Sequence, residues 1–439
     1  MLTKIIKFLK SKEVILFMCI FFVYIVNPYI LGTWDGYPNQ LLPISIVEDQ
    51  DFYLDEFADN ILPEKIPYSI RLINGHFVSL YPPGVALLVS PLYIIPVLAN
   101  ILNSYVAIMA MVKIAAAILA SLSAIFIYKI LKKFISGNWS LIITLLYAFS
   151  TCHWVITSQD LWKNTGTEFL LTASLLLLFS ERVSKNRIVL LGFMVGALIT
   201  IKQLNIVFIG LFSIYILIQY RKYIWQYIGG LIPPILFIIA YNIVYLGSIS
   251  DIGYGEGVIN PLMSNQFSNS LINIPVAFLG LFFSPARGML FFSPVLIFAF
   301  IGMGLVFKKK NVLPPNLLLL LKISVPVLFF YSVLVSRWIT WWGGSVYGYR
   351  MVLDLLPFII LFFIPVIHSN FWKRKSVLYI FFGLLIISVF VQLVGVVSWD
   401  SSWFDNLNMN SITDPHSKVF WSITDSPIFH YTRRFFGKY

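Results

Sequence analysis

The stretch ILGTWDGYPNQLLPISIVEDQDFYLDEF, residues 30–57, changes abruptly from an apolar segment to a cluster of carboxylates. The run 13–31 is apolar and long enough to cross the roughly 30 Å of a bilayer core. The acidic residues that follow it are Asp35, Glu48, Asp49, Asp51, Asp55 and Glu56. This contrast predicts a first membrane span that opens into a polar loop at the membrane surface.

The composition of the whole chain is that of a protein with many membrane spans. Of its 439 residues, 59% are hydrophobic and 11% are charged, whereas soluble domains average about 25% charged residues. Windows long enough to span a membrane fall at 13–31, 104–131, 139–157, 165–182, 187–201, 204–219, 224–246, 286–307, 316–336, 351–368 and 376–397. We therefore predict an all-α protein with about eleven transmembrane helices.

Basic residues predict the direction of these spans. Eighteen of the 31 lysines and arginines form six clusters, at 4–12, 129–133, 182–187, 221–222, 308–310 and 373–375. A cytoplasmic N-terminus puts all six clusters inside, as the positive-inside tendency favours. Counting the apolar run 84–102 as a crossing would put five clusters outside. We therefore interpret 84–102, and similarly 271–284, as a re-entrant or interfacial helix hairpin.

This topology divides the chain into a transmembrane core, residues 1–397, and an extracytoplasmic tail, residues 398–439. The core includes a first outer loop, residues 33–103, which we predict to be amphipathic or re-entrant. In that loop Asp35 directly follows the first span. A carboxylate there, shielded by Trp34 and Tyr37, could accept a proton from a hydroxyl, or it could simply be the aspartate of an Asp-Gly turn.

Two further outer stretches could bind a substrate. HFVSLYPPGVALLVSPLY, residues 76–93, places Tyr81 beside a turn that begins an apolar helix, and a helix N-terminus can hold a phosphate. TSQDLWKNTGTEF, residues 157–169, is a polar turn whose Asp160 and Asn164 could line a cavity for a sugar. Plain turns explain both stretches equally well, and a solvated helix face explains the acids of residues 48–56.

Basic and aromatic residues at the outer ends of spans could receive a phosphate and a sugar. The basic candidates are Lys202, Arg287 and Arg350, and arginine suits a phosphate because its guanidinium is planar and permanently charged. Trp341 could stack on a sugar ring. A snorkelling lysine and an interfacial aromatic belt are the structural alternatives.

Taken in order, these stretches resemble the GT-C-type glycosyltransferases, multi-span enzymes that use a polyprenyl-phosphate-linked sugar as donor. The resemblance covers residues 13–370 and rests on the acid after the first span, then LPISIVEDQDFYLDEF, YPPG, SQDLW, SPARG and WWGGSVYGYRMVLDLLP. The chain is similar to bacterial relatives of protein O-mannosyltransferases and aminoarabinose transferases. Its length also suits the serotype-converting O-antigen glucosyltransferases. The family often has two adjacent acids where this chain has Asp35 and Gly36. Relatives often carry an acid or a histidine in the second outer turn, where the nearest matches are Asp160 and Asn164.

The resemblance implies an all-α GT-C-like bundle that transfers a hexose, glucose favoured, with inversion. The donor would be an undecaprenyl phosphate sugar and the acceptor a glycan such as O-antigen, at the outer face of a bacterial inner membrane. Asp35 would be the catalytic base. Residues that orient the loop or acceptor would be Asp55, Glu56, Asp160 and Asn164, and donor-binding residues would be Tyr81, Lys202, Arg287, Arg350 and Trp341.

Cations can neutralise a leaving phosphate, so this reaction requires no cofactor, although a divalent metal is compatible with it. The partners expected are the lipid-linked donor, a glycan acceptor, membrane lipids, and a donor synthase and flippase; nucleic acid is not expected. Other acceptors are protein or lipid A. The alternative functions are an O-antigen polymerase or ligase, whose dominant outer loop usually comes later in the chain, and a lipid-linked glycan flippase. A transporter of that kind should show charged or broken spans at matching positions in two halves.

Overall fold

The computed structural model describes residues 11–27, 35–58, 67–180, 183–249, 271–308, 312–405, 407 and 414–437. These residues are predominantly helical, as predicted, and their one sheet is a two-stranded hairpin of β1 (Ile70–Ile73) and β2 (His76–Ser79). The chain divides into two compact units. Unit 1 contains residues 1–29, 120–158 and 267–439, and unit 2 contains residues 30–119 and 159–266.

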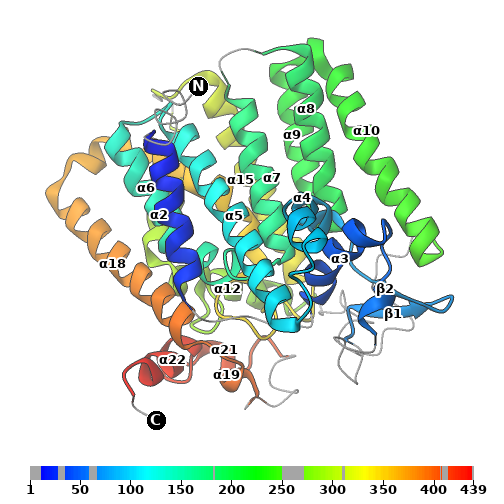
Figure 1. Cartoon of the computed structure of the whole chain (residues 1–439). Helices are drawn as coiled ribbons and strands as arrows, with labels where there is room; N and C mark the ends of the chain where they lie inside the picture. The colour runs from blue at the N-terminus through cyan, green and yellow to red at the C-terminus, as the bar shows by residue number, and fades with distance from the viewer. Residues whose placement is uncertain are drawn as a thin grey trace. The chain divides into compact units, whose positions relative to one another are not determined.

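Unit 2 contains the first outer loop and four of the predicted spans. Its helices are α3 (Tyr37–Glu48), α4 (Gly84–Leu98), the first part of α5 (Tyr105–Leu131), α7 (Lys163–Leu178), α8 (Lys185–Ala197), α9 (Ile206–Gln219) and α10 (Ile224–Tyr241). Short turns of helix are η1 (Asp55–Phe57), η3 (Leu198–Thr200), η4 (Gln203–Asn205), η5 (Arg221–Tyr223) and η6 (Asn242–Leu246). Figure 1 shows α8, α9 and α10 side by side.

Glycines allow α8 and α10 to approach closely. A β-carbon at Gly192 would lie 2.2 Å from the carbonyl oxygen of Tyr227, and one at Gly230 would lie 2.1 Å from that of Val189. Small residues at a helix–helix contact are typical of membrane helices, because close backbone packing takes the place of the hydrophobic effect there.

Helix α3 belongs to the outer loop that was predicted to be amphipathic or re-entrant, but it is mostly buried on all sides and has no polar exposed face along residues 38–45. It begins at Tyr37, and residues 38–45 are buried. Its polar side chains are buried with partners: Asn39 donates to the carbonyl of Leu161, and Gln40 donates to Asp160. The prediction was wrong because these partners come from a distant part of the chain.

The two strands of the hairpin are joined by a tight turn. Asn74 and Gly75 both have positive φ, 52° and 88°, as the two-residue turn of a type I′ hairpin requires.

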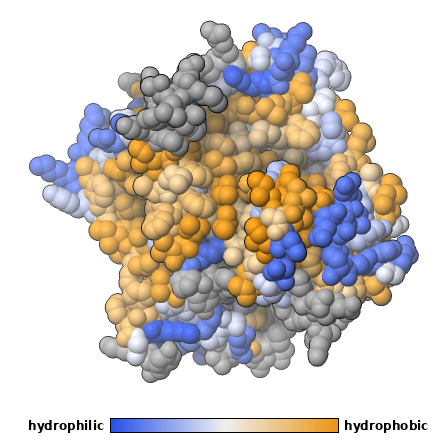
Figure 2. Space-filling model, viewed as in Figure 1, coloured by the Kyte–Doolittle hydropathy of each residue, from blue (hydrophilic) through white to orange (hydrophobic). Residues whose placement is uncertain are grey.

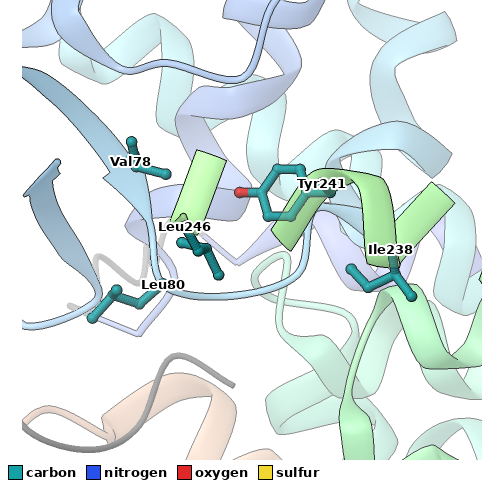
Figure 3. Close-up of a cluster of buried hydrophobic side chains, with 5 residues drawn as sticks. All are labelled: Val78, Leu80, Ile238, Tyr241 and Leu246. Atoms are coloured by element: carbon teal, nitrogen blue, oxygen red, sulfur yellow. The ribbon is translucent and has the colours of Figure 1, made fainter. Parts of the chain in front are cut away.

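The hairpin is held on α10 by a small apolar cluster. The cluster consists of Val78, Leu80, Ile238, Tyr241 and Leu246 (Figure 3). The hydroxyl of Tyr241 also donates to the carbonyl of Ser79, at 3.4 Å. The hairpin is therefore fixed relative to the end of α10.

Unit 1 contains the remaining predicted spans and the C-terminal tail. Its helices are α2 (Lys12–Val26), the second part of α5, α6 (Gly137–Phe149), α12 (Ile274–Phe283), α13 (Met289–Phe292), α14 (Ile297–Leu305), α15 (Pro315–Ser336), α16 (Leu356–Ile359), α17 (Phe363–Ile367), α18 (Lys375–Ser398), α19 (Ser402–Asp405), α21 (Lys418–Trp421) and α22 (Pro427–Phe435). Short turns of helix are η2 (His153–Thr157), η7 (Pro294–Leu296), η8 (Arg350–Leu355), η9 (Ile360–Phe362) and η10 (Asn370–Lys373).

The C-terminal tail is packed onto the last long helix. Helix α22 contacts α18, where Phe435 and Phe436 lie 6.2 and 6.4 Å from the ring of Phe390. Arg434 forms an ion pair with Asp400, and the imidazole of His430 lies 3.1 Å from the hydroxyl of Ser402. Polar contacts and aromatic packing therefore both attach α22.

Among the residues that the structure describes, five helical segments are long and apolar enough to cross a membrane: Tyr105–Leu131, Arg221–Leu246, Pro315–Ser336, Arg350–Ile367 and Lys375–Ser398. Shorter apolar helices include Gly84–Leu98, Gly137–Phe149, Gln203–Gln219, Ile274–Phe283 and Pro294–Leu305. Many large apolar side chains on these helices are exposed, and apolar residues cover broad areas in Figure 2. These features are those of a multi-pass membrane protein. Eleven crossings and their direction stay predictions.

The two predicted helix hairpins are instead single helices. Helix α4 occupies residues 84–98 without a reversal, although it contains Pro91 and Pro96. It is roughly 22 Å long at 1.5 Å per residue, shorter than a bilayer core. Helix α12 similarly occupies residues 274–283.

Candidate active site

Asp35, the predicted base, lies in the turn directly before α3, in unit 2. Its Oδ1 atom accepts hydrogen bonds from the hydroxyls of Tyr68 and Tyr81, each 2.7 Å long. The aspartate is partly exposed, whereas Tyr81 is buried. Two donors on one oxygen fix the orientation of the carboxylate, which a general base requires. Trp34, predicted to shield Asp35, lies outside the described residues.

The hairpin delivers both tyrosines to Asp35. Tyr68 lies two residues before β1, and Tyr81 lies two residues after β2. The hydroxyl of Ser79 donates to the carbonyl of Tyr81 at 2.8 Å and accepts from its N–H at 3.0 Å, which fixes the chain after β2. The sequence analysis selected Tyr81 but missed Tyr68, because pairing across the hairpin is what brings Tyr68 to the same place.

Lys163 adds a positive charge to this group. Its Nζ atom lies 3.0 Å from the centroid of the Tyr81 ring, whose hydroxyl is bonded to Asp35. A cation over an aromatic face is attracted by the negative charge of that face. Lys163 is the first residue of α7. The sequence analysis placed it in a polar turn and did not select it as a phosphate ligand.

Two helix N-termini and Lys202 meet beside this group. A β-carbon at Gly84, the first residue of α4, would lie 2.5 Å from the carbonyl oxygen of Thr200. A β-carbon at Gly166, in the first turn of α7, would lie 2.9 Å from Ile201. Lys202 directly follows Thr200 and Ile201 in the sequence and is partly exposed. The YPPG turn, the second outer turn and the Lys202 segment are therefore brought together.

Asp160, the other candidate carboxylate of this unit, is fully buried. It accepts two hydrogen bonds from Nε2 of Gln40, at 3.0 and 3.1 Å, and one from the N–H of Leu161, at 2.7 Å. Asn39 donates to the carbonyl of Leu161 at 2.9 Å. These contacts tie the second outer turn to α3. Asn164, in the first turn of α7, is also buried.

Asp55 and Glu56, predicted together with Asp160 and Asn164 to orient the loop or acceptor, have contacts that stabilise the loop. Asp55 accepts a hydrogen bond from the N–H of Phe77, at 2.6 Å, and forms an ion pair of 2.6 Å with His76. Glu56 accepts a hydrogen bond from the hydroxyl of Ser45 in α3. Partial burial of its carboxyl group raises the pKa of Glu56. The hydrogen bond from Ser45 lowers this pKa, but by less than burial raises it.

The predicted residues Arg287 and Arg350 belong to unit 1, where they hold a glycine-rich loop. Arg287 is buried and donates to the carbonyls of Val346, at 2.5 Å, and Gly344, at 3.0 Å. Arg350 donates to the carbonyl of Gly343, at 3.4 Å. Gly343 and Gly344 have φ of 88° and 81°, a conformation that only glycine adopts readily.

Trp341 lies in the interior of unit 1. Its ring is fully buried and lies 4.9 Å from the ring of Phe420. A β-carbon at Gly280 would lie 2.4 Å from it. The indole Nε1 has no hydrogen-bond partner among the described residues. The surroundings of Trp341 are those of a packed core side chain.

Possible metal ligands are not clustered in the described part of the chain. No group of three or more His, Cys, Asp or Glu residues there could hold a metal ion.

No protein-family model matches the sequence, and no curated protein matches it significantly. Among solved structures, the chain is similar to the crystal structure of the Archaeoglobus fulgidus oligosaccharyltransferase in complex with zinc and sulfate, with a TM-score of 0.47 and 15% identity. The match covers 90% of this chain and 54% of that one, so this chain spans about half the length of that enzyme. A likeness this weak carries no argument about activity.

Proposed function

We propose that this protein is a membrane glycosyltransferase that transfers a sugar from a polyprenyl phosphate to an acceptor hydroxyl. The observation that carries the proposal is the partly exposed carboxylate of Asp35, held by Tyr68 and Tyr81 beside the cation of Lys163. A base and a cation in one group are what displacement of a phosphate by a hydroxyl requires. The order of the sequence motifs supports the same reaction.

Asp35 would accept the proton of the attacking hydroxyl. The hydroxyl oxygen forms a bond to the anomeric carbon of the donor while the bond from that carbon to the phosphate oxygen breaks. The electron pair of the broken bond leaves with the lipid phosphate, and a single in-line displacement inverts the anomeric centre. Of Asp35 and Asp160, Asp35 is the accessible carboxylate, which supports its role as the base.

The lipid phosphate would lie at the N-termini of α4 and α7. Each helix presents the positive end of its dipole at its first turn. Lys163 begins α7, and Lys202 directly follows Thr200 and Ile201, which lie against Gly84 of α4 and Gly166 of α7. Each charge-assisted bond to a phosphate contributes about 1.5–3 kcal/mol. Tyr81 is also assigned to donor binding. The same assignment of Trp341, Arg287 and Arg350 rests on the sequence resemblance alone, because in unit 1 these side chains pack in the core or hold the glycine-rich loop.

The finer identity of the substrates follows from the sequence resemblance. We propose a hexose, glucose favoured, on undecaprenyl phosphate, and a glycan acceptor such as O-antigen. Asp55, Glu56, Asp160 and Asn164 would position the outer loop for that acceptor, without a required cofactor. The reaction would take place at the outer face of a bacterial inner membrane, with the N-terminus in the cytoplasm. A donor synthase and a flippase would supply the donor.

Mass spectrometry of surface glycans from cells with and without the gene tests this function. If the protein is a glycosyltransferase of this kind, cells without the gene should still make the glycan, but each acceptor unit should lack one hexose. Loss of the whole glycan, or of its polymerisation, would instead support a flippase, polymerase or ligase. A missing hexose on protein or on lipid A would keep the activity and change the acceptor.

A further inference from the structure

We propose that the outward face of α22 binds the headgroups of anionic phospholipids. This face consists of Phe429, Arg433 and Phe436, which are called the stripe below. The stripe belongs to unit 1, and the proposal does not depend on the proposed transfer reaction. Lipid binding can therefore be measured without any sugar substrate.

The stripe lies opposite the face by which α22 packs on the protein. Phe429, Arg433 and Phe436 are spaced by four and three residues, so they share one side of the helix. All three are exposed, Phe429 by 43% and Phe436 by 62%. Tyr431 is instead buried, and its hydroxyl donates to the carbonyl of Asp400. The packed face therefore fixes α22 while the stripe stays exposed.

Helix α22 rests on a side of α18 that is apolar and exposed elsewhere along its length (Figure 1). The rings of Phe435 and Phe436 pack on Phe390 of α18. Ile386 and Val397, four residues before Phe390 and seven after it, share its side of the helix. Ile386 is 69% exposed and Val397 is 49% exposed. Because α18 is long and apolar enough to cross a membrane, this side of it meets lipid.

The position of Phe390 places α22 at the edge of the lipid layer. Helix α18 has 24 residues, so it is roughly 36 Å long and extends about 3 Å beyond each side of a bilayer core when centred. Phe390 lies eight residues before Ser398, the last residue of α18, and therefore roughly 9 Å inside the hydrocarbon boundary. Interfacial helices bury their apolar side chains about 5–10 Å deep. The long stem of Arg433 allows its guanidinium to reach the phosphates from this depth.

The charge of the C-terminal segment suits an anionic lipid. Residues 427–439 contain three basic residues and no acidic residue. Arg434 forms an ion pair with Asp400, whereas Arg433 has no ion pair within the described residues. Asp425 lies before the opposite end of α22. A guanidinium is permanently charged and can donate two parallel hydrogen bonds to a phosphate, so Arg433 suits a phosphodiester headgroup.

A second copy of this chain fits the stripe less well than lipid does. A stable protein–protein interface buries about 800 Å² on each partner, whereas the stripe holds three side chains on one short helix. A symmetric contact through the stripe would also bring two copies of Arg433 together, and like charges repel.

Hydrogen exchange of the full-length protein in nanodiscs at a fixed pH tests the proposal. One set of discs contains phosphatidylcholine alone, and the other contains an equal mixture of phosphatidylcholine and phosphatidylglycerol. We expect the amides of α22 to be better protected against exchange in the anionic discs. Arg433→Gln should lower that protection about fivefold, the effect of one basic residue at an anionic surface, and leave the zwitterionic discs unchanged. Phe436→Ser should lower the protection in both kinds of disc.

Lys418→Gln is the matched control, because Lys418 is an exposed basic residue in α21 of the same tail and lies outside the stripe. This variant loses the same charge and should keep the wild-type protection of α22. The proposal is overturned if both kinds of disc protect wild-type α22 equally, or if Lys418→Gln and Arg433→Gln have the same effect. Protection that appears only when two copies share a disc would identify a second copy as the occupant and also overturn it.

Discussion

Replacing Gly84 by alanine tests whether contact with the Thr200 backbone holds the YPPG turn in place. The new β-carbon would lie 2.4 Å from the Thr200 hydroxyl oxygen, and 2.5 and 2.6 Å from its carbonyl oxygen and carbon. A backbone carbonyl cannot rotate away as a side chain can, so the start of α4 must move by roughly 1 Å. Overpacking of this kind costs about 1–3 kcal/mol. The same movement would shift Tyr81, three residues earlier, away from Asp35.

Unfolding of the purified protein by SDS titration measures this cost, and sugar transfer measures the displacement of Tyr81. Gly210→Ala is the matched control, because Gly210 lies on α9 of the same unit and an added β-carbon there would have no atom within 4 Å. That variant should unfold at the wild-type SDS concentration or slightly above it, since alanine favours helix. A Gly84→Ala protein as stable as wild type would refute the reasoning. So would its rescue by Thr200→Ala, which removes the hydroxyl and the γ-methyl group but leaves the backbone carbonyl in place.

Three further predictions concern other contacts. Tyr68→Phe and Tyr81→Phe should each lower kcat about tenfold, because each removes one donor from the Asp35 carboxylate; unchanged kcat in both would separate these tyrosines from catalysis. Arg287→Lys should destabilise the protein by about 2–3 kcal/mol in SDS titration, because lysine lacks the fork that holds the glycine loop; a stable variant with weakened donor binding would instead indicate contact with phosphate. Burial lowers the pKa of His430 in the docked helix. The imidazole therefore takes up a proton at a higher pH when α22 is undocked than when it is docked. The docking of α22 should weaken as the pH falls from about 7 through that lowered pKa. The protection factors of the α22 amides, which correct exchange rates for the pH dependence of intrinsic exchange, should fall between pH 7.5 and 5, whereas His430→Gln should remove this difference.

The helical character of the chain could be predicted from its apolar windows, and each window contains helix in the residues that the structure describes. The hairpin also had a signal in the sequence, since Asn74-Gly75 stands between alternating residues that favour strands. The burial of α3 had no such signal. Asn39 and Gln40 mark a polar face in the sequence, and only their partners at Asp160 and Leu161 make burial favourable.

The candidate site could be predicted in part for the same reason. Asp35 stands out because a carboxylate directly after an apolar span is unusual. The contact of Lys163 with Tyr81 joins segments 82 positions apart and depends on how the starts of α4 and α7 pack. Arg287 was selected for its charge, but its hydrogen bonds go to loop carbonyls. Sequence position can suggest which groups are reactive, whereas their partners are set by packing.

The central claim is that Asp35 removes the proton from the acceptor. The most direct measurement is the initial rate of hexose transfer from purified polyprenyl phosphate sugar by the wild type, Asp35→Asn and Asp160→Asn in nanodiscs. Asp35→Asn should lose about 10²–10⁴ in rate while its SDS stability and donor binding stay near wild type. Asp160→Asn should transfer at a measurably higher rate than Asp35→Asn, because an amide oxygen can still accept from Gln40 and Leu161. The account is contradicted if Asp35→Asn keeps more than about a tenth of the wild-type rate while Asp160→Asn loses it.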